Sequence, residues 1–142
     1  MRKLITLSFL PNSYDFALLL LRVWFGLMLF YKHGIEKIFH FPTMAQHFPD
    51  PLHIGPHSSL LLAMISDGIC SLLLVIGIAT RWAALYCAII IGTAFVAVHH
   101  FALSGPHSGE LAYTYVGAAL TIFFAGPGRF SIDGSSARKQ RY

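Results

Sequence analysis

Four long apolar runs constrain this chain more than any other feature of its sequence. They extend over residues 14–31 with a continuation to 39, then over 58–79, 82–103 and 110–125. A helix needs about 20 mostly apolar residues to cross the hydrocarbon core of a bilayer. Each run is apolar throughout instead of along a single stripe, which distinguishes it from an amphipathic surface helix. We therefore predict an all-α integral membrane protein, built as a bundle of four transmembrane helices.

The composition excludes the main alternatives to a membrane protein. Charged residues make up 11% of the 142 residues and hydrophobic residues 56%, whereas soluble domains carry about 25% charged residues. A chain this small exposes much surface per unit volume, so a soluble fold would need more polar cover. The same composition excludes a disordered chain and a disulfide-rich secreted module.

Basic residues are divided unequally between the two sides that four spans would define. One side carries Arg2, Lys3, Arg81, Arg129, Arg138, Lys139 and Arg141, and the other carries Lys32 and Lys37. The positive-inside rule then predicts that both termini are cytoplasmic. The net charge of +4 is explained by this placement at the ends of apolar runs, so we expect no nucleic-acid partner.

We expect the chain to have three parts. Residues 1–13 form a cytoplasmic or interfacial segment, with Asn12 or Ser13 capping the first helix; residues 14–133 form the membrane domain, and residues 134–142 a basic cytoplasmic tail. The chain from Gly126 is rich in Gly, Ser and charge, and we expect it to be loosely ordered. Only Thr80-Arg81 separates the second and third runs, which predicts a tight turn between antiparallel neighbours.

Two ionisable residues lie well inside the predicted spans. Arg22 falls in the first run and Asp67 in the second. A charge at membrane depth is costly and normally faces a partner or a water-filled cavity. The assumed ends of the two runs put both residues within about one helical turn in depth, so we predict an intramembrane ion pair. Such a pair either fixes the packing of the two helices or lines a path for a substrate or a proton.

A polar patch is predicted at the outer ends of the helices. His33 and Lys37 are i,i+4 neighbours on one helix face, with His99 near the end of the third run and Glu110 at the start of the fourth. We predict that these four residues form a pocket for a ligand, a quinone or another substrate. Glu110 either pairs with Lys37 or His99, or serves only the helix dipole.

The sequence indicates metal binding only weakly and does not indicate thiol chemistry. All eight histidines lie on the outer side or at outer helix ends, but their spacing matches no zinc site, which leaves His99 and His100 as weak metal candidates. The two cysteines, Cys70 and Cys87, are far apart in apolar runs and form no CxxC pair. They therefore give no signal of a redox dithiol or of a thiolate zinc site.

Four patches together resemble the DoxX family of small four-helix membrane proteins. They are HGIEKI at 33–38, GIATRWAAL at 77–85, GELA at 109–112 and GPGRFSID at 126–133. Their order and spacing cover residues 17–133. Asp67 stands where the family leads us to expect a glutamate, and the His-rich outer loop is longer than expected. The family takes its name from a membrane subunit similar to DoxD of a thiosulfate:quinone oxidoreductase, and other members look like partners of oxidative-stress enzymes.

Three hypotheses of function follow, and we assign no catalytic residue. The leading one is a multi-pass subunit of a quinone-linked redox system, for thiosulfate, other sulfur compounds or oxidative stress, in a bacterial inner membrane. The second is a non-catalytic scaffold or assembly partner. The third, ranked below both, is a small transporter or metal carrier. Besides the lipid bilayer, we expect a protein partner or a homo-oligomer, and a quinone is the cofactor that the first hypothesis implies.

Overall fold

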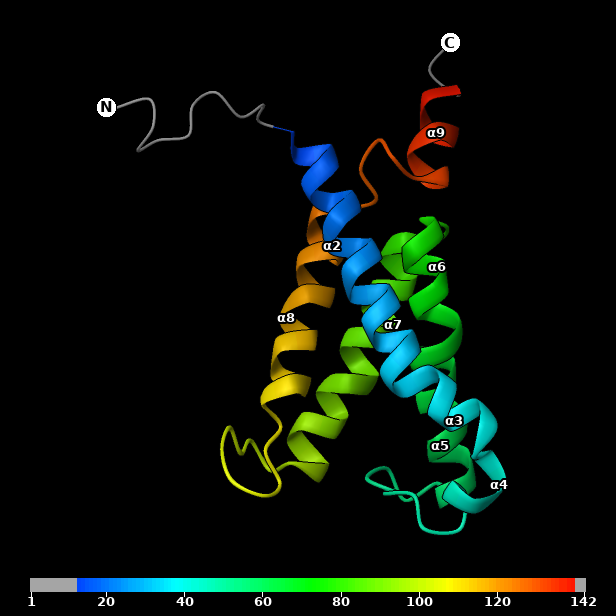
Figure 1. Ribbon diagram of the computed structural model, residues 1–142, viewed down its shortest axis with the longest axis vertical. Helices are drawn as coiled ribbons and strands as arrows, with labels where there is room; N and C mark the ends of the chain where they lie inside the picture. Colours follow the sequence, from blue (N-terminus) through cyan, green and yellow to red (C-terminus); the bar gives the residue numbers. More distant parts are fainter. Residues whose placement is uncertain (1–12, 140–142) are drawn as a thin grey trace, which may run out of the picture.

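The structure, a computed structural model, describes residues 13–139 and consists of helices joined by short loops (Figure 1). The first helical unit comprises α2 (Tyr14–Leu29), the π-helical turn η1 (Phe30–Gly34) and α3 (Ile35–Phe39), and α4 (Phe41–Met44) follows it. The second comprises α5 (Pro56–Met64), the π-helical turn η2 (Ile65–Cys70) and α6 (Ser71–Ile76). The third comprises α7 (Thr80–Thr93) and the π-helical turn η3 (Ala94–Val98), and α8 (Glu110–Ala125) and α9 (Ile132–Lys139) complete the fold.

Three of these helical units are long and apolar enough to cross a membrane. They are Tyr14–Phe39 with 26 residues, Pro56–Ile76 with 21 and Thr80–Val98 with 19. The fourth predicted run, α8, is apolar but only 16 residues long. Large apolar side chains cover the outside: Trp24, Tyr31, Trp82 and Phe124 are each more than 70% exposed. Such a surface suits contact with lipid and not with water.

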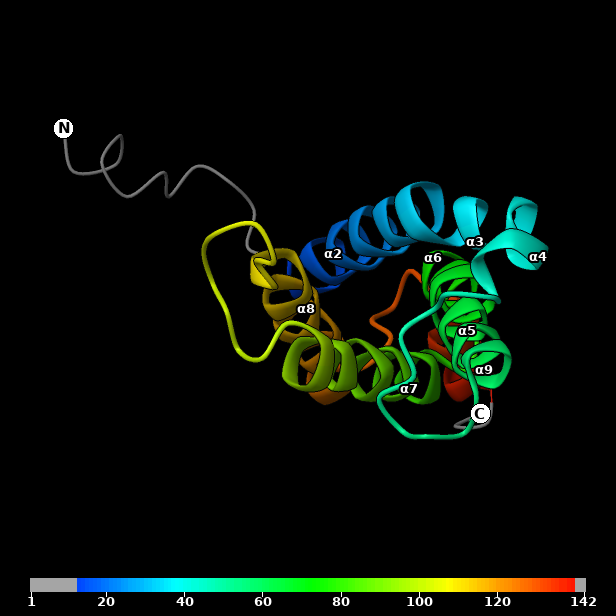
Figure 2. The same ribbon diagram turned by 90° about the horizontal axis from the view of Figure 1, so that it is seen from below.

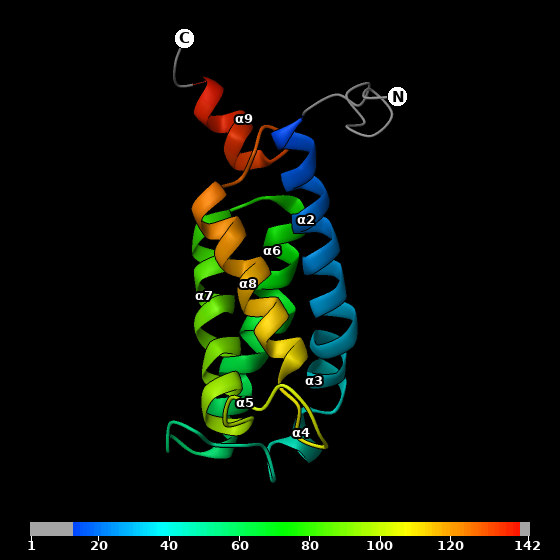
Figure 3. The ribbon, with the colours of Figure 1, turned by 90° about the vertical axis from the view of Figure 1, so that its left-hand side faces the viewer.

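The four apolar units form a ring in which neighbours in sequence are neighbours in space. Figure 2 shows α2, α6, α7 and α8 in this order, and Figure 3 shows α8 lying between α7 and α2. The start of α2, the turn before α7 and α9 lie at one end, which we call the terminal end. The loops after α4 and η3 lie at the other, which we call the loop end. Ser13 accepts a hydrogen bond from the Phe16 N–H at 3.2 Å and so caps α2 as predicted, whereas Asn12 lies outside the described residues.

Two glycines let the first helical unit approach the second closely. A Cβ atom at Gly26 would collide with the carbonyl oxygen of Ser71, and one at Gly34 with the carbonyl oxygen of Asp67. Missing side chains at such positions allow helix backbones to touch. Because the two units are antiparallel, these two contacts fix which residues of one unit face which of the other.

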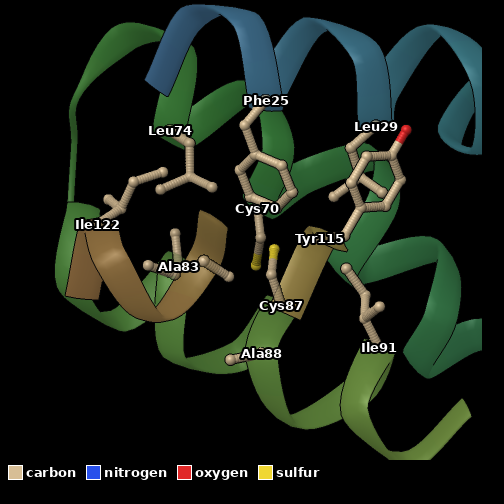
Figure 4. Packing of buried hydrophobic residues seen from close by; sticks show 12 residues of the cluster. Phe25, Leu29, Cys70, Leu74, Ala83, Cys87, Ala88, Ile91, Tyr115 and Ile122 are labelled. Atoms are coloured by element: carbon tan, nitrogen blue, oxygen red, sulfur yellow. The ribbon is translucent and has the colours of Figure 1, made fainter. Parts of the chain in front are cut away.

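The core lies between the four units. Figure 4 shows side chains from all of them meeting there: Phe25, Leu29, Cys70, Leu74, Ala83, Cys87, Ala88, Ile91, Tyr115 and Ile122. Many members are small, so the helices pack tightly and the cluster needs few bulky residues.

The turn between the second and third units differs from the prediction. It occupies residues 77–79, with Gly77 and Ala79 at positive φ (79° and 47°), while Thr80 and Arg81 already belong to α7. The carboxylate of Asp133 accepts hydrogen bonds from the N–H groups of Ala79 (3.0 Å) and Thr80 (2.8 Å) and from the Thr80 hydroxyl (2.8 Å). An acidic acceptor here satisfies free donors at the helix start and stabilises the strained turn.

The same contacts correct the expectation of a loosely ordered tail. The segment after Gly126 is fastened at three points: by Asp133, by the carbonyl of Phe130, which accepts a bond from Arg22 (2.6 Å), and by the N–H of Arg129, which donates to Asp15 (2.8 Å). The segment thereby supplies hydrogen-bond partners for the side chains of Asp15 and Arg22 in α2 and for the N–H groups at the turn before α7.

We predict that Asp133→Ala destabilises the protein by about 1 kcal/mol, the usual cost of losing a helix cap. Burial opposes ionisation of Asp133, but the bonds from Thr80 and Ala79 and the charge of Arg22 outweigh it and lower the pKa of this carboxyl. A lowered pKa means that the stabilisation is complete above the unfolded value of about 4 and is lost as the pH falls through the folded value. In detergent, the unfolding temperature of the variant should therefore be lower than that of wild type at neutral pH, and the two temperatures should converge in acid. Arg129→Ala, which removes an exposed side chain 3.9 Å from Asp15, is the control and should change stability little.

Candidate functional site

All three π-helical turns border one cavity at the loop end of the bundle. The cavity has a volume of about 300 Å³. η1 contributes His33, η2 contributes Asp67 and η3 contributes Ala94. The polar residues of its lining are His33, Lys37, Asp67, His99, Ser108 and Tyr115. π-helical turns are rare and occur often at functional sites, so their convergence marks this polar cavity as the candidate site.

An ion pair between Lys37 and Asp67 forms the centre of the polar cavity. Lys37 Nζ lies 2.8 Å from Asp67 Oδ2, and both side chains are about 10% exposed. Lys37 Nζ also donates to the carbonyl oxygen of His33, at 3.4 Å. An ammonium group has three protons to donate, so one remains for a ligand. Burial of either charge alone would be costly, and the pairing removes most of that cost.

The predicted pairing of Asp67 with Arg22 is wrong. Arg22 lies nearer the terminal end, where Nη1 donates to the carbonyl of Leu74 (2.9 Å) and Nη2 to that of Phe130. The antiparallel register set at Gly26 and Gly34 puts Arg22 opposite Leu74, and seven residues of helix, or about 10 Å, separate Leu74 from Asp67. The prediction estimated the depth of Arg22 and Asp67 in the membrane from the ends of the apolar runs, and this estimate missed the offset along the helix. Arg22 is fully buried and joins α2, α6 and the tail segment, which is a structural role.

Tyr115 brings to the cavity a hydroxyl group for which residues 13–139 offer no hydrogen-bond partner. The residue is 8% exposed, and its Oη finds no hydrogen-bond partner among the described residues. Its ring meets the His33 ring edge to face, with centroids 6.1 Å apart. A buried hydroxyl without a partner is costly. The position of Tyr115 at a cavity therefore indicates a ligand, or a water molecule, that accepts or donates a hydrogen bond there.

Three of the four residues predicted for the outer pocket come together. His33, Lys37 and His99 line the polar cavity, whereas Glu110 is exposed in the first turn of α8 and is not part of the lining. His99 Nδ1 lies 3.0 Å from the carbonyl oxygen of His107. A carbonyl only accepts, so this contact keeps the proton on Nδ1 and leaves Nε2 as an acceptor. The expectation that Glu110 joins this pocket is thus wrong, because the helix turns its side chain outward.

The weak metal candidates receive no support from the geometry. His100 is exposed at φ 49°, beyond the end of η3, and does not line the cavity that His99 lines. Within residues 13–139, no three His, Cys, Asp or Glu side chains gather closely enough to hold a metal ion.

A second, apolar chamber adjoins the polar cavity. It has a volume of about 220 Å³ and shares Phe48, Ala63, Ile90, Ala94 and His99 with the polar cavity. The rest of its lining is mostly apolar and includes Pro49, Pro51, Leu52 and Leu62. The long outer loop therefore contributes to the lining of both spaces, and Phe48 belongs to both linings. A polar space joined to an apolar one suits a ligand with a polar head and an apolar body.

Part of this site could be predicted from the sequence, and part could not. The HGIEKI patch pointed to His33 and Lys37. The role of Phe48 and the pairing of Asp67 with Lys37 had no signal in the hydropathy pattern, because both depend on register and loop path.

The Lys37–Asp67 ion pair predicts how single and double substitutions change the free energy of unfolding. Asp67→Leu should cost about 3–5 kcal/mol, since it leaves the Lys37 ammonium buried without a counter-charge. The double variant Lys37→Met with Asp67→Leu should recover most of that loss. Thermal unfolding and size-exclusion profiles in detergent would measure both, with Lys32→Met as the exposed control from the same helix. Equal destabilisation of the single and double variants would contradict the pairing.

Comparison with known proteins gives one match. The DoxX family model matches residues 17–100, more than half of the chain. No curated protein matches the chain, and no solved structure does. The match spans the first three helical units and includes His33, Lys37, Asp67 and His99. The chain is a multi-pass membrane protein and belongs to the DoxX family.

Proposed function

We propose that this protein is the membrane subunit of a quinone-linked redox system, and that the polar cavity holds the quinone head. One observation carries the proposal: the buried hydroxyl of Tyr115 lacks a partner among residues 13–139 and lies beside a lysine–aspartate pair in a cavity that continues into an apolar chamber. The source of electrons would be thiosulfate, another sulfur compound or an oxidative-stress enzyme, delivered through a protein partner.

The residues of the cavity fit a quinone. A quinone head presents two carbonyl oxygens, which need hydrogen-bond donors, and Lys37, His33 and Tyr115 are donors. The apolar chamber offers room for the isoprenoid chain next to the head. When bound, a quinone would supply two-electron redox chemistry. The chain's own residues would hold the head, keep water away from it, and provide Asp67 and His33 as groups that exchange protons.

Two other functions compete with this one. A scaffold or assembly partner would need no ligand, and the exposed apolar helix faces would then serve a second protein or a second copy of the chain. A small transporter or metal carrier would use the buried charges as its path, but the metal version has no ligand cluster in the described range to support it. The unsatisfied Tyr115 hydroxyl favours a ligand over a scaffold.

We further propose a four-span topology with both termini in the cytoplasm of a bacterial cell, in the inner membrane. At 16 residues, α8 is short for a span, and local thinning of the bilayer would accommodate it. Arg81 and Arg129 belong to the terminal end and Lys32 to the loop half. The bias of basic residues supports cytoplasmic termini.

The first experiment is quinone binding to detergent-purified protein. Wild type should bind decylubiquinone, His33→Ala should abolish measurable binding, and Tyr115→Phe should weaken it by about five- to tenfold, the value of one hydrogen bond. Tyr113→Phe is the matched control, because Tyr113 lies on the same helix, 59% exposed and outside the cavity lining. Isothermal titration calorimetry would measure each dissociation constant.

Unchanged binding in both His33→Ala and Tyr115→Phe would contradict the site. Absence of binding in wild type would contradict the quinone function, and one stable co-purified protein partner would then support the scaffold. Thermal unfolding of each variant checks that it is folded, so loss of binding is not confused with loss of structure.

The topology has its own test. Alkaline phosphatase, which is active only outside the cytoplasm, should be inactive when fused after Tyr142 and active when inserted at Gln46 in the outer loop. An active carboxyl-terminal fusion would contradict cytoplasmic termini.

A further inference from the structure

The two cysteines, which are 17 residues apart in the sequence, meet in the core of the bundle. Cys70 ends η2 in the second helical unit and Cys87 lies in α7. Figure 4 shows their sulfur atoms turned toward each other between the helices, within reach of a hydrogen bond. The Cys87 thiol also donates to the carbonyl oxygen of Ser66, at 3.5 Å. Both cysteines are free thiols. The spacing of the two cysteines in the sequence carried no signal of this contact, because helix packing and not a CxxC motif brings the two thiols together.

The two thiols differ in access. Cys87 is fully buried, whereas Cys70 is 7% exposed and lines an apolar groove of about 390 Å³ between α6 and α7. Leu73, Trp82 and Tyr86 also line this groove, which is open to the outside of the bundle. In a membrane that outside is lipid. A lipid-soluble molecule would approach Cys70 from this groove, whereas Cys87 does not line it.

We propose that Cys70 and Cys87 form a redox-active dithiol in the membrane core, which a lipid-soluble quinone oxidises through the groove between α6 and α7. Two S–H bonds break and one S–S bond forms. The two electrons and two protons pass to the quinone, which leaves as quinol. The choice of a quinone as the oxidant rests on the proposed function, while the pairing of the two thiols does not. The disulfide would also tie the second helical unit to the third.

The groove site is distinct from the polar cavity. Its lining and that of the polar cavity have no residue in common. Cys70 and Asp67 both belong to η2, so the two sites share one helical unit but use different sides of it. A variant of the polar cavity should therefore leave the thiol reaction intact.

The test is oxidation of the reduced wild-type protein in lipid nanodiscs by decylubiquinone, without oxygen. We expect the intact mass to fall by two hydrogen atoms and one quinol to form per chain. Trypsin cleaves after Arg81 and so separates Cys70 from Cys87. After oxidation, peptides 38–81 and 82–129 should remain linked until a reductant is added. Two thiols that both still react with maleimide after unfolding would overturn the proposal.

Variants test the route and separate the two proposals. Cys70→Ser and Cys87→Ser should each abolish quinol formation. Leu73→Trp, which fills the groove, should slow oxidation about tenfold, while Leu72→Trp on the neighbouring exposed position should change it less than about twofold. Equal rates for these two would overturn the groove as the route. His33→Ala should lose quinone binding at the polar cavity and still oxidise its thiols like wild type. Quinone binding that His33→Ala retains, with normal thiol oxidation, contradicts the polar cavity alone. Thiol oxidation that is lost in His33→Ala contradicts an independent thiol site.

Discussion

A charge inside an apolar bundle must find a partner, and this requirement organises the loop half of the protein. The Lys37–Asp67 pair meets it at 2.8 Å, with both side chains almost fully buried. The pair forms because Gly34 lets η1 lie against the Asp67 backbone, which brings the next turn of the first unit to the carboxylate. The same requirement is met differently at Arg22, where backbone carbonyls of α6 and of the tail segment replace a counter-charge. Neutral acceptors suffice there because a guanidinium group has several donors to distribute.

The three π-helical turns give the bundle its functional asymmetry. Near the terminal end the helices are regular and close together, and small residues such as Ala83 and Ala84 fill the space between them. Toward the loop end each of the first three units contains one turn with an extra residue, which shifts the side chains that follow it around the helix. In this half of the bundle lies a space of about 300 Å³, and its lining includes six polar residues.

Two sites with different chemistry would thus share the second helical unit. The polar cavity has proton-exchanging groups and a hydroxyl group without a partner in the described chain, but no group of its own that carries electrons. The cysteine pair can carry two electrons and faces a groove open to lipid. Both suit a lipid-soluble carrier of electrons and protons. η2 holds Asp67 and Cys70 within one turn of helix, but the two residues line different spaces.

The sequence by itself determined the helical class, the approximate limits of the four apolar units and the resemblance to DoxX proteins, because these depend on hydropathy and on short local patterns. It also identified His33, Lys37 and His99 as members of one polar patch, since they recur at the same ends of their helices. Only the tertiary structure decided that Asp67 pairs with Lys37 and not with Arg22, that Glu110 faces outward, that Phe48 lines the cavity and that Cys70 meets Cys87. Each of these depends on the register and rotation of one helix against another. That register is set by where glycines allow backbones to touch and by extra residues in π-helical turns, neither of which changes the hydropathy of the chain.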